Sequence, residues 1–249
     1  MHQVIIYGNP AFNKPGYWDP VTALIDWCEE NYIQNRFIAE YWNTISNVGY
    51  FLLFLATLKK LKTDDFHHFN YSIAIMILAI GSGLYHATLS YEAQLLDECP
   101  MILIGVTMMF DALSLFKVRF FYPGNFVTKI SPLLITLAIC IANEKLRSKV
   151  FFQTLFGIII FSSFFIIGLA NRKSNRSNRN ISRALFIAVF GFVLWIVDSQ
   201  FCEQIIQIRR NSKLLGVLLQ GHMWWHLLTA LSGYYLLLER KQRINAKID

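Results

Sequence analysis

The sequence predicts an all-α polytopic membrane protein, a bundle of seven transmembrane helices. Three observations support this prediction: 55% of the 249 residues are hydrophobic and only 16% charged, long apolar stretches recur along the chain, and the connections between them are short. An ordinary soluble domain carries about 25% charged residues. The composition also excludes a disordered chain, a coiled coil and a collagen-like fibre.

Seven stretches approach the roughly 20 apolar residues that a membrane-spanning helix needs. The fifth is the clearest because no charge interrupts it, and the first is short, with a polar beginning at Asn43, Ser46 and Asn47. Short connections are typical of an antiparallel bundle. The predicted spans are about 42–58, 71–91, 98–116, 126–143, 150–170, 184–201 and 215–238.

We expect a single domain over residues 1–249, with an acidic N-terminal segment (1–41), the bundle (about 42–238) and a tail (239–249). The loops after the first, third and fifth spans, together with the tail, hold 14 Lys and Arg residues, and the opposite side holds 8. The positive-inside rule therefore places the C-terminus in the cytosol and the N-terminus in a lumen. The net charge of +7 is interpreted as basic loops at a membrane, not as a nucleic-acid partner.

Three histidines lie at the same depth of the predicted bundle. Ionisable groups inside a membrane are energetically unfavourable and often have a function. His222 and His226 are four residues apart near the start of the seventh span, so they project from one helix face. His86 lies near the end of the second span, four residues after Ser82, and Asp97 opens the third. Three His with an open position are the pattern of a catalytic zinc site.

A zinc ion at this place lowers the pKa of its bound water to around 7. Asp97 is then placed to take the proton and pass it to a leaving group, and Ser82 to donate a hydrogen bond to an oxyanion. The plainer alternative, histidines that only hydrogen-bond within the bundle, stays open on spacing alone. His67 and His68 are interpreted as members of a solvated loop.

The N-terminal segment is rich in acids, with five of the chain's 16 in the first forty residues. Clustered carboxylates suit calcium, which takes six to eight oxygen ligands. The residues alone favour the other interpretation, a solvated amphipathic segment at the membrane surface. Cys28 and Cys202 both fall on the predicted lumenal side, where a disulfide persists, but the sequence does not fix their pairing.

Several separate motifs, in the same order, resemble the alkaline ceramidase family. These are integral membrane amidases of the endoplasmic reticulum and Golgi, grouped with the adiponectin and progestin receptors in a superfamily of seven-helix metal-dependent hydrolases. The matching pieces are DWCEENY at 26–32, IAEYWNTISN at 38–47, GSGLYHATLSYEAQLLDECPM at 81–101, WIVDSQFC at 195–202 and HMWWH at 222–226.

The resemblance implies roles that spacing does not. It implies zinc ligation by three histidines, acid/base catalysis and transition-state stabilisation by two further residues, a calcium site in the acidic segment, and a disulfide. It therefore reverses the preference against calcium, and it leaves the role of Asp198 open. The implied residues are His86, His222 and His226 for zinc, Asp97 and Ser82 for catalysis, Asp26, Trp27 (by its carbonyl), Glu29, Asn31 and Glu40 for calcium, and Cys28 with Cys202 for the disulfide.

The function implied is zinc-dependent, calcium-supported hydrolysis of the lipid ceramide to a sphingoid base and a free fatty acid, in the endoplasmic reticulum or Golgi membrane. The other hypothesis is a seven-helix receptor of the adiponectin-receptor type, in which the metal is structural. The short basic loops, without a sizeable cytosolic domain, count against a receptor.

Overall fold

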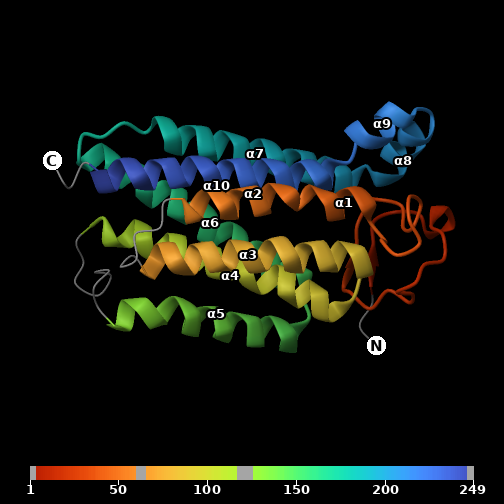
Figure 1. The fold of residues 1–249 in the computed structure, drawn as a ribbon, viewed down its shortest axis with the longest axis horizontal. Helices are drawn as coiled ribbons and strands as arrows, with labels where there is room; N and C mark the ends of the chain where they lie inside the picture. Colours follow the sequence, from red (N-terminus) through yellow and green to blue (C-terminus); the bar gives the residue numbers. More distant parts are fainter. Residues whose placement is uncertain (1–3, 60–65, 117–125, 246–249) are drawn as a thin grey trace. The chain divides into compact units, whose positions relative to one another are not determined.

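The computed structural model describes residues 4–59, 66–116 and 126–245, and these are mostly helical (Figure 1). Strand is limited there to the two-residue parallel pair β1–β2, in which Ile5 lies opposite Ile25. The prediction of an all-α protein is confirmed. The elements are β1 (Ile5–Ile6), the 3₁₀ helix η1 (Pro10–Phe12), β2 (Ile25–Asp26), α1 (Tyr41–Ser46), α2 (Val48–Leu58), α3 (Phe66–Thr88), α4 (Tyr91–Ser114), α5 (Phe126–Leu146), α6 (Lys149–Lys173), α7 (Arg179–Gln200), α8 (Cys202–Arg210), α9 (Lys213–Leu218) and α10 (Gly221–Asn245).

Four helices of the described chain, α3, α4, α6 and α7, are long and apolar enough to cross a membrane. On α6, large apolar side chains at helical spacing point outward, with 41–67% of their surface exposed: Ile158, Phe161, Phe165 and Leu169. A stripe of this kind is stable when lipid is the solvent. The chain is therefore a membrane protein, and the count of seven spans stays a prediction.

Helix boundaries differ from the predicted spans at both ends of the bundle. The first span consists of two helices, α1 and α2, which meet at Asn47. The seventh begins at Gly221 instead of 215, because α9 ends where the N–H of Leu219 bonds back to the carbonyl of Leu215.

The interpretation of His67 and His68 as loop residues is wrong. Helix α3 begins at Phe66, five residues before the predicted span, so both histidines lie in its first turn and are buried. The Nε2 atom of His68 lies 3.1 Å from the carbonyl oxygen of Thr57. Some basic residues counted for orientation lie outside the described residues: Lys60, Lys62, Lys117, Arg119 and Lys247.

The contacts divide the chain into two compact units, and the single-domain boundaries stay a prediction. The first unit is Met1–Phe51, Leu78–Asp97 and Ile187–Ala230. In it, the N-terminal segment (residues 4–40 of the described chain) docks on the turn between α3 and α4. The carbonyl of Leu89, in the left-handed region at φ 49°, accepts the N–H groups of Thr22 and Ala23. Figure 1 shows α8 and α9 on the same side as this segment.

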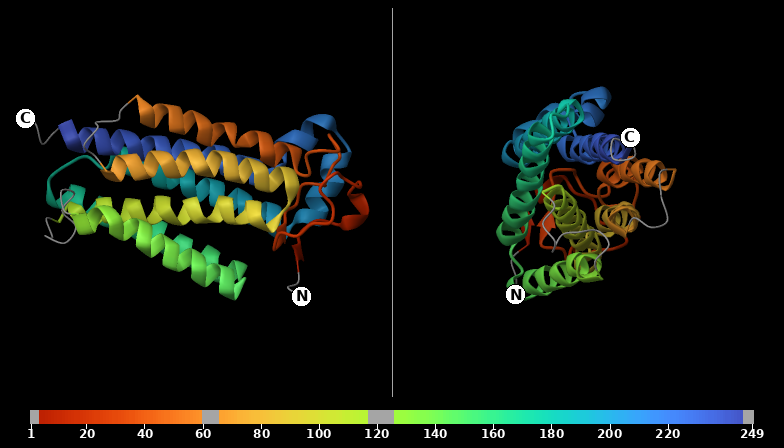
Figure 2. Two further views of the ribbon diagram at one scale, coloured as in Figure 1. Left: turned by 60° about the horizontal axis from the view of Figure 1, so that its bottom comes forward. Right: turned by 90° about the vertical axis from the view of Figure 1, so that its left-hand side faces the viewer.

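The second unit is Leu52–Ile77, Glu98–Phe186 and Leu231–Asp249. The right-hand view of Figure 2 looks along its helices. Its core includes α4 and α6 side chains, among them Ile102, Val106 and Phe152. Asp111 of α4 binds the guanidinium groups of Arg240 and Arg243 on α10, at 2.9 Å for Arg243. This paired cluster neutralises buried charge that would otherwise destabilise the unit.

Candidate metal centre

Three buried histidines of the first unit converge on one point. His86 comes from the end of α3, and His222 and His226 from the first two turns of α10. At most 5% of any of these residues is exposed, and their nearest ligand nitrogens all lie within 4.8 Å of one another. The convergence expected from the sequence spacing is therefore present in the structure.

The orientation of His86 follows from how the N-terminal segment meets α3. The last carbonyls of a helix lack partners within it. Here Ala39 and Glu40 donate their N–H groups to the carbonyls of Ala87 and His86, both at 2.9 Å. This docking brings the Glu40 carboxylate to 2.5 Å from Nδ1 of His86. When Glu40 is ionised its carboxylate can only accept, so Nδ1 then carries the hydrogen and Nε2 keeps the lone pair that a metal needs.

His226 is held in the same tautomer by α1. Its Nδ1 lies 3.2 Å from the carbonyl oxygen of Asn43 and 2.8 Å from the hydroxyl of Ser46. The carbonyl can only accept, so Nδ1 donates and Nε2 is left as the free ring nitrogen. Two of the polar residues at the start of the first predicted span, Asn43 and Ser46, thus support this histidine.

His222 is positioned by an aromatic contact. Its ring centroid lies 4.1 Å from that of Trp27, with the planes inclined by 31°. The backbone N–H of Trp27 in turn donates to Oε1 of Glu40 at 2.9 Å. The N-terminal segment therefore touches two of the three histidines, through Glu40 on His86 and Trp27 on His222.

The histidine cluster fits a metal ion. Nε2 of His86 and Nδ1 of His222 are buried without a hydrogen-bond partner in the part of the chain that the structure describes. Buried polar atoms without partners are costly, and an ion that accepts their lone pairs removes that cost. Ligand nitrogens around a tetrahedral zinc lie about 3.4 Å apart, and the observed spacing of at most 4.8 Å is of that order. Neutral imidazole is the ligand form required.

Ser82 and Asp97 lie on two closely packed helices, α3 and α4. A Cβ on Gly81 of α3 would sit only 2.2 Å from the carbonyl oxygen of Leu96 on α4, so only glycine permits this approach. The neighbouring residues are Ser82, fully buried one turn before His86, and the half-buried Asp97. Asp97 lies in the second turn of α4, not at its start as expected, because α4 begins at Tyr91.

Three acidic residues of the N-terminal segment, Asp26, Glu29 and Glu40, are buried and bound to N–H groups. Glu29 accepts from the backbone of Trp42 and Asn43 at 2.7 and 2.8 Å, which caps the start of α1. Both oxygens of Asp26 accept from the side chain of Asn31. Among the described residues, the histidine cluster is the one place where three potential metal ligands from His, Cys, Asp or Glu side chains lie close together.

Burial makes these carboxyl groups costly to ionise. It raises the pKa of Asp26 to about 7 and that of Glu29 to about 8, in both cases assisted by the charge of Glu40, and it raises the pKa of Glu40 itself to about 8. Carboxylates in this state are stabilised by a proton or by a cation. Asn31 adds a buried Oδ1 for which the described chain offers no hydrogen-bond donor. The donor chemistry of the segment therefore fits calcium.

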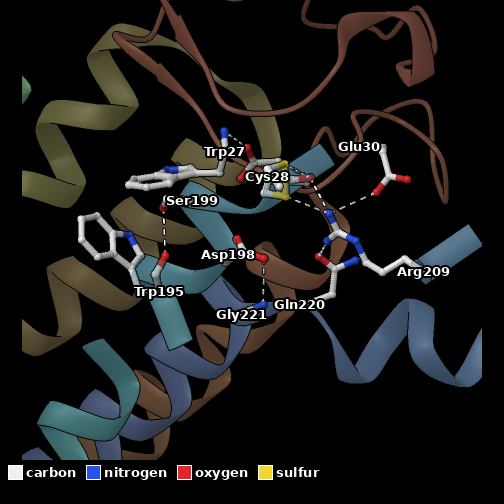
Figure 3. Close-up of a disulfide and its surroundings, with 11 residues drawn as sticks. Trp27, Cys28, Glu30, Trp195, Asp198, Ser199, Arg209, Gln220 and Gly221 are labelled. Carbon is white, nitrogen blue, oxygen red and sulfur yellow. Dashed lines mark hydrogen bonds and ion pairs between the residues drawn. A yellow bond between two sulfur atoms is a disulfide. The ribbon is translucent and has the colours of Figure 1, made fainter. Parts of the chain in front are cut away.

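A disulfide joins Cys28 to Cys202, the first residue of α8 (Figure 3). The pairing implied by the resemblance is thus present. Nearby, the buried guanidinium of Arg209 donates to the carbonyl of Cys28 at 2.7 Å and to the side chain of Gln220, the residue just before α10. Sequence reasoning missed Arg209, since a basic residue between two spans is indistinguishable from a solvated loop residue.

Comparisons with known proteins show the family of this chain. The Ceramidase family matches residues 19–242. Alkaline ceramidase 3 of Mus musculus is 32% identical over 90% of this chain and 85% of the mouse protein. Alkaline ceramidase YPC1 of Saccharomyces cerevisiae is 31% identical over 91% of this chain and 78% of its own length, and an alkaline ceramidase of Arabidopsis thaliana is 30% identical over 88% and 82%. The chain therefore belongs to the ceramidase family of hydrolases.

Proposed function

We propose that this protein hydrolyses the amide bond of ceramide within the membrane, with zinc at the three histidines. The convergence of His86, His222 and His226 is the observation that carries the proposal. The acceptors at Nδ1 of His86 and His226 favour the tautomer that a metal needs. Membership of the ceramidase family and the names of its relatives support the substrate. The products are a sphingoid base and a free fatty acid.

The metal ions have separate tasks in this proposal. Zinc, held by His86, His222 and His226, supplies a Lewis acid that activates water at neutral pH. Calcium, held by the acidic segment, fixes the parts of that segment that touch the histidines. Its ligands are Asp26, the carbonyl of Trp27, Glu29, Asn31 and Glu40.

The chain's own residues move the protons and stabilise charge. Ser82 donates its hydroxyl hydrogen to the amide oxygen, where negative charge develops as water attacks the carbonyl carbon. Asp97 takes the proton of that water and delivers it to the amide nitrogen, so that the C–N bond breaks and the sphingoid amine leaves. Glu40 keeps the His86 ring in place throughout.

The proposed setting is the endoplasmic reticulum or Golgi membrane, with the N-terminus in the lumen and the C-terminus in the cytosol. The disulfide supports this orientation, because it lies in the first unit with the N-terminal segment and disulfides persist in oxidising compartments. The lipid enters the bundle laterally. Family membership favours a hydrolase over the receptor hypothesis.

A hydrolysis assay combined with metal analysis tests the proposal. Purified protein is incubated with labelled ceramide, and released fatty acid and bound zinc are measured. We expect about one zinc per chain and ceramide cleavage, both lost in His222→Ala. Trp224→Phe is the matched control on the same helix, since that side chain is partly exposed and bonds only the carbonyl of Leu218. Cleavage by zinc-free protein would refute the mechanism.

Calcium is tested separately by mild chelation. We expect a calcium-selective chelator to lower turnover while zinc stays bound, because the segment loses its hold on Glu40 and Trp27. Full activity in a calcium-free, zinc-replete sample contradicts the calcium proposal and leaves the zinc proposal standing.

A further inference from the structure

The position of His222 depends on the start of α10. The acceptor that caps the first N–H groups of α10 comes from another helix. The first N–H groups of a helix have no acceptor within it. The carbonyl of Gln220 begins the helix by accepting the N–H of Trp224. The Gln220 side chain does not serve as a cap, because its oxygen accepts from Arg209 and its nitrogen donates to the carbonyl of Gly216.

Asp198 of α7 supplies the missing acceptor. Its Oδ1 accepts the N–H of Gly221 at 3.1 Å (Figure 3). The N–H of His222 also bonds to this carboxyl. Only 2% of Asp198 is exposed. A carboxylate at a helix N-terminus is further stabilised by the positive end of the helix dipole. Asp198 is therefore bonded to the backbone of the histidine itself.

Gly221 makes the contact tight. A Cβ at this position would lie 2.6 Å from Cβ of Asp198 and 2.7 Å from the carbonyl oxygen of Leu194, so no other residue fits without displacing α10 from α7. The cap and the close packing together fix the first turn of α10. The ring of His222 is thereby held between Trp27, at 4.1 Å, and His86, at 5.0 Å between ring centroids.

We propose that Asp198 is a positioning residue for the metal site, acting through the backbone of Gly221 and His222. This inference rests on the proposed function, since it takes His222 as a zinc ligand. Asp198 binds neither metal nor substrate. Without its carboxylate the first turn of α10 frays, and His222 loses its fixed position. His226, one turn further on, is held independently by Ser46 and Asn43.

Zinc affinity distinguishes this role from a merely structural one. A residue that only holds helices together lowers thermal stability when removed and leaves the affinity of folded protein for zinc unchanged. The test compares wild type with Asp198→Ala, Asp198→Asn and the neighbouring control Ser199→Ala. For each protein, zinc affinity is measured by competition with a chelator, together with kcat, KM and Tm. The Ser199 hydroxyl bonds only the carbonyl of Trp195 in its own helix.

We expect Asp198→Ala to bind zinc about 10- to 100-fold more weakly, as for other residues that orient a ligand. Its kcat falls at limiting zinc and recovers in excess zinc, with KM unchanged. Asp198→Asn keeps an oxygen acceptor and stays within about threefold of wild type, since Asn and Asp cap equally well. Ser199→Ala matches wild type.

If Asp198→Ala binds zinc as tightly as wild type, the inference is overturned and the proposed function stands. The same holds if Asp198→Asn binds zinc as weakly as Asp198→Ala. A wild-type protein that binds no zinc overturns both. If Asp198→Ala does not fold, Gly221→Ala provides the test. The added Cβ displaces the first turn of α10 while Asp198 is intact. Unchanged zinc affinity in this variant would show that the position of that turn does not affect zinc binding, and would refute the positioning role of Asp198.

Discussion

Replacing Glu40 by Gln tests the link between the N-terminal segment and the histidines. The two Glu40 oxygens accept from three donors: Oε1 from the backbone of Trp27, and Oε2 from Nδ1 of His86 and the side chain of Asn43. Gln has nearly the same shape but offers one oxygen and one NH₂ group. In either orientation of the Gln amide, its NH₂ group faces at least one of the N–H groups that Glu40 accepts from, so that hydrogen bond is lost.

The expected loss follows from that mismatch. If the NH₂ group replaces Oε2, His86 loses its acceptor, and the ring is free to turn or change tautomer. Loss of a carboxylate behind a ligating histidine typically costs 10- to 100-fold in metal affinity, or about 1.4–2.7 kcal/mol. We therefore expect Glu40→Gln to bind zinc about 10- to 100-fold more weakly, with turnover restored only in part by excess zinc.

The assay is zinc competition against a chelator of known affinity, run at saturating calcium and repeated without calcium. Glu203→Gln, an exposed substitution of the same kind on α8, is the control and matches wild type. Equal zinc affinities for Glu40→Gln and wild type would show that the 2.5 Å contact with His86 does not orient a ligand.

Three further outcomes are expected. Ser82→Ala lowers kcat by about 100- to 1,000-fold without changing zinc content, whereas Ser163→Ala, a buried serine bonded only to its own helix at the carbonyl of Ile159, keeps full activity; loss of zinc from Ser82→Ala would point to a structural role instead. Reduction of wild type lowers Tm, because the disulfide closes a separation of 174 residues, and Cys202→Ser shows the low value without responding to reductant; a Tm that reductant leaves unchanged contradicts this. In the proposed orientation the sequons at Asn175 and Asn180 face the cytosol and stay unglycosylated in cells, and a glycan found on either by mass spectrometry contradicts that orientation.

The class of the fold and the convergence of the histidines were predictable from sequence because both depend on local periodicity. The i, i+4 spacing of His222 and His226 fixes a shared helix face once a helix is assumed. His86 joins them because the end of one span and the start of another lie at the same depth. Helix boundaries were less predictable: α10 begins at Gly221 because the end of α9 and the Asp198 contact determine it, and both depend on the tertiary fold.

The groups that orient the histidines were not predictable from the residues themselves. Glu40 lies 46 residues from His86, and Ser46 lies 180 residues from His226, so no short-range pattern connects either pair. The burial of the acidic segment was missed for the same reason. A run of acids looks solvated unless the chain supplies donors from elsewhere, as the backbone of Trp42 and Asn43 does for Glu29.

The contacts of Glu40 and Trp27 also predict that the two metal sites are thermodynamically coupled. In the proposed arrangement, calcium held by the acidic segment would fix both residues, and these contact His86 and His222 directly. Calcium therefore raises zinc affinity, and by reciprocity zinc raises calcium affinity by the same factor, about 5- to 150-fold for typical couplings.

Calcium titrations of zinc-free and zinc-loaded protein measure this factor. Ser46→Ala is an informative control, because the Ser46 hydroxyl bonds the ring of His226 and the carbonyl of Asn43, and neither belongs to the acidic residues of the segment. It weakens zinc binding but leaves the coupling factor as in wild type. Equal calcium affinities with and without zinc would mean that the segment folds against the histidines without transmitting the state of one site to the other, and that calcium only stabilises the fold.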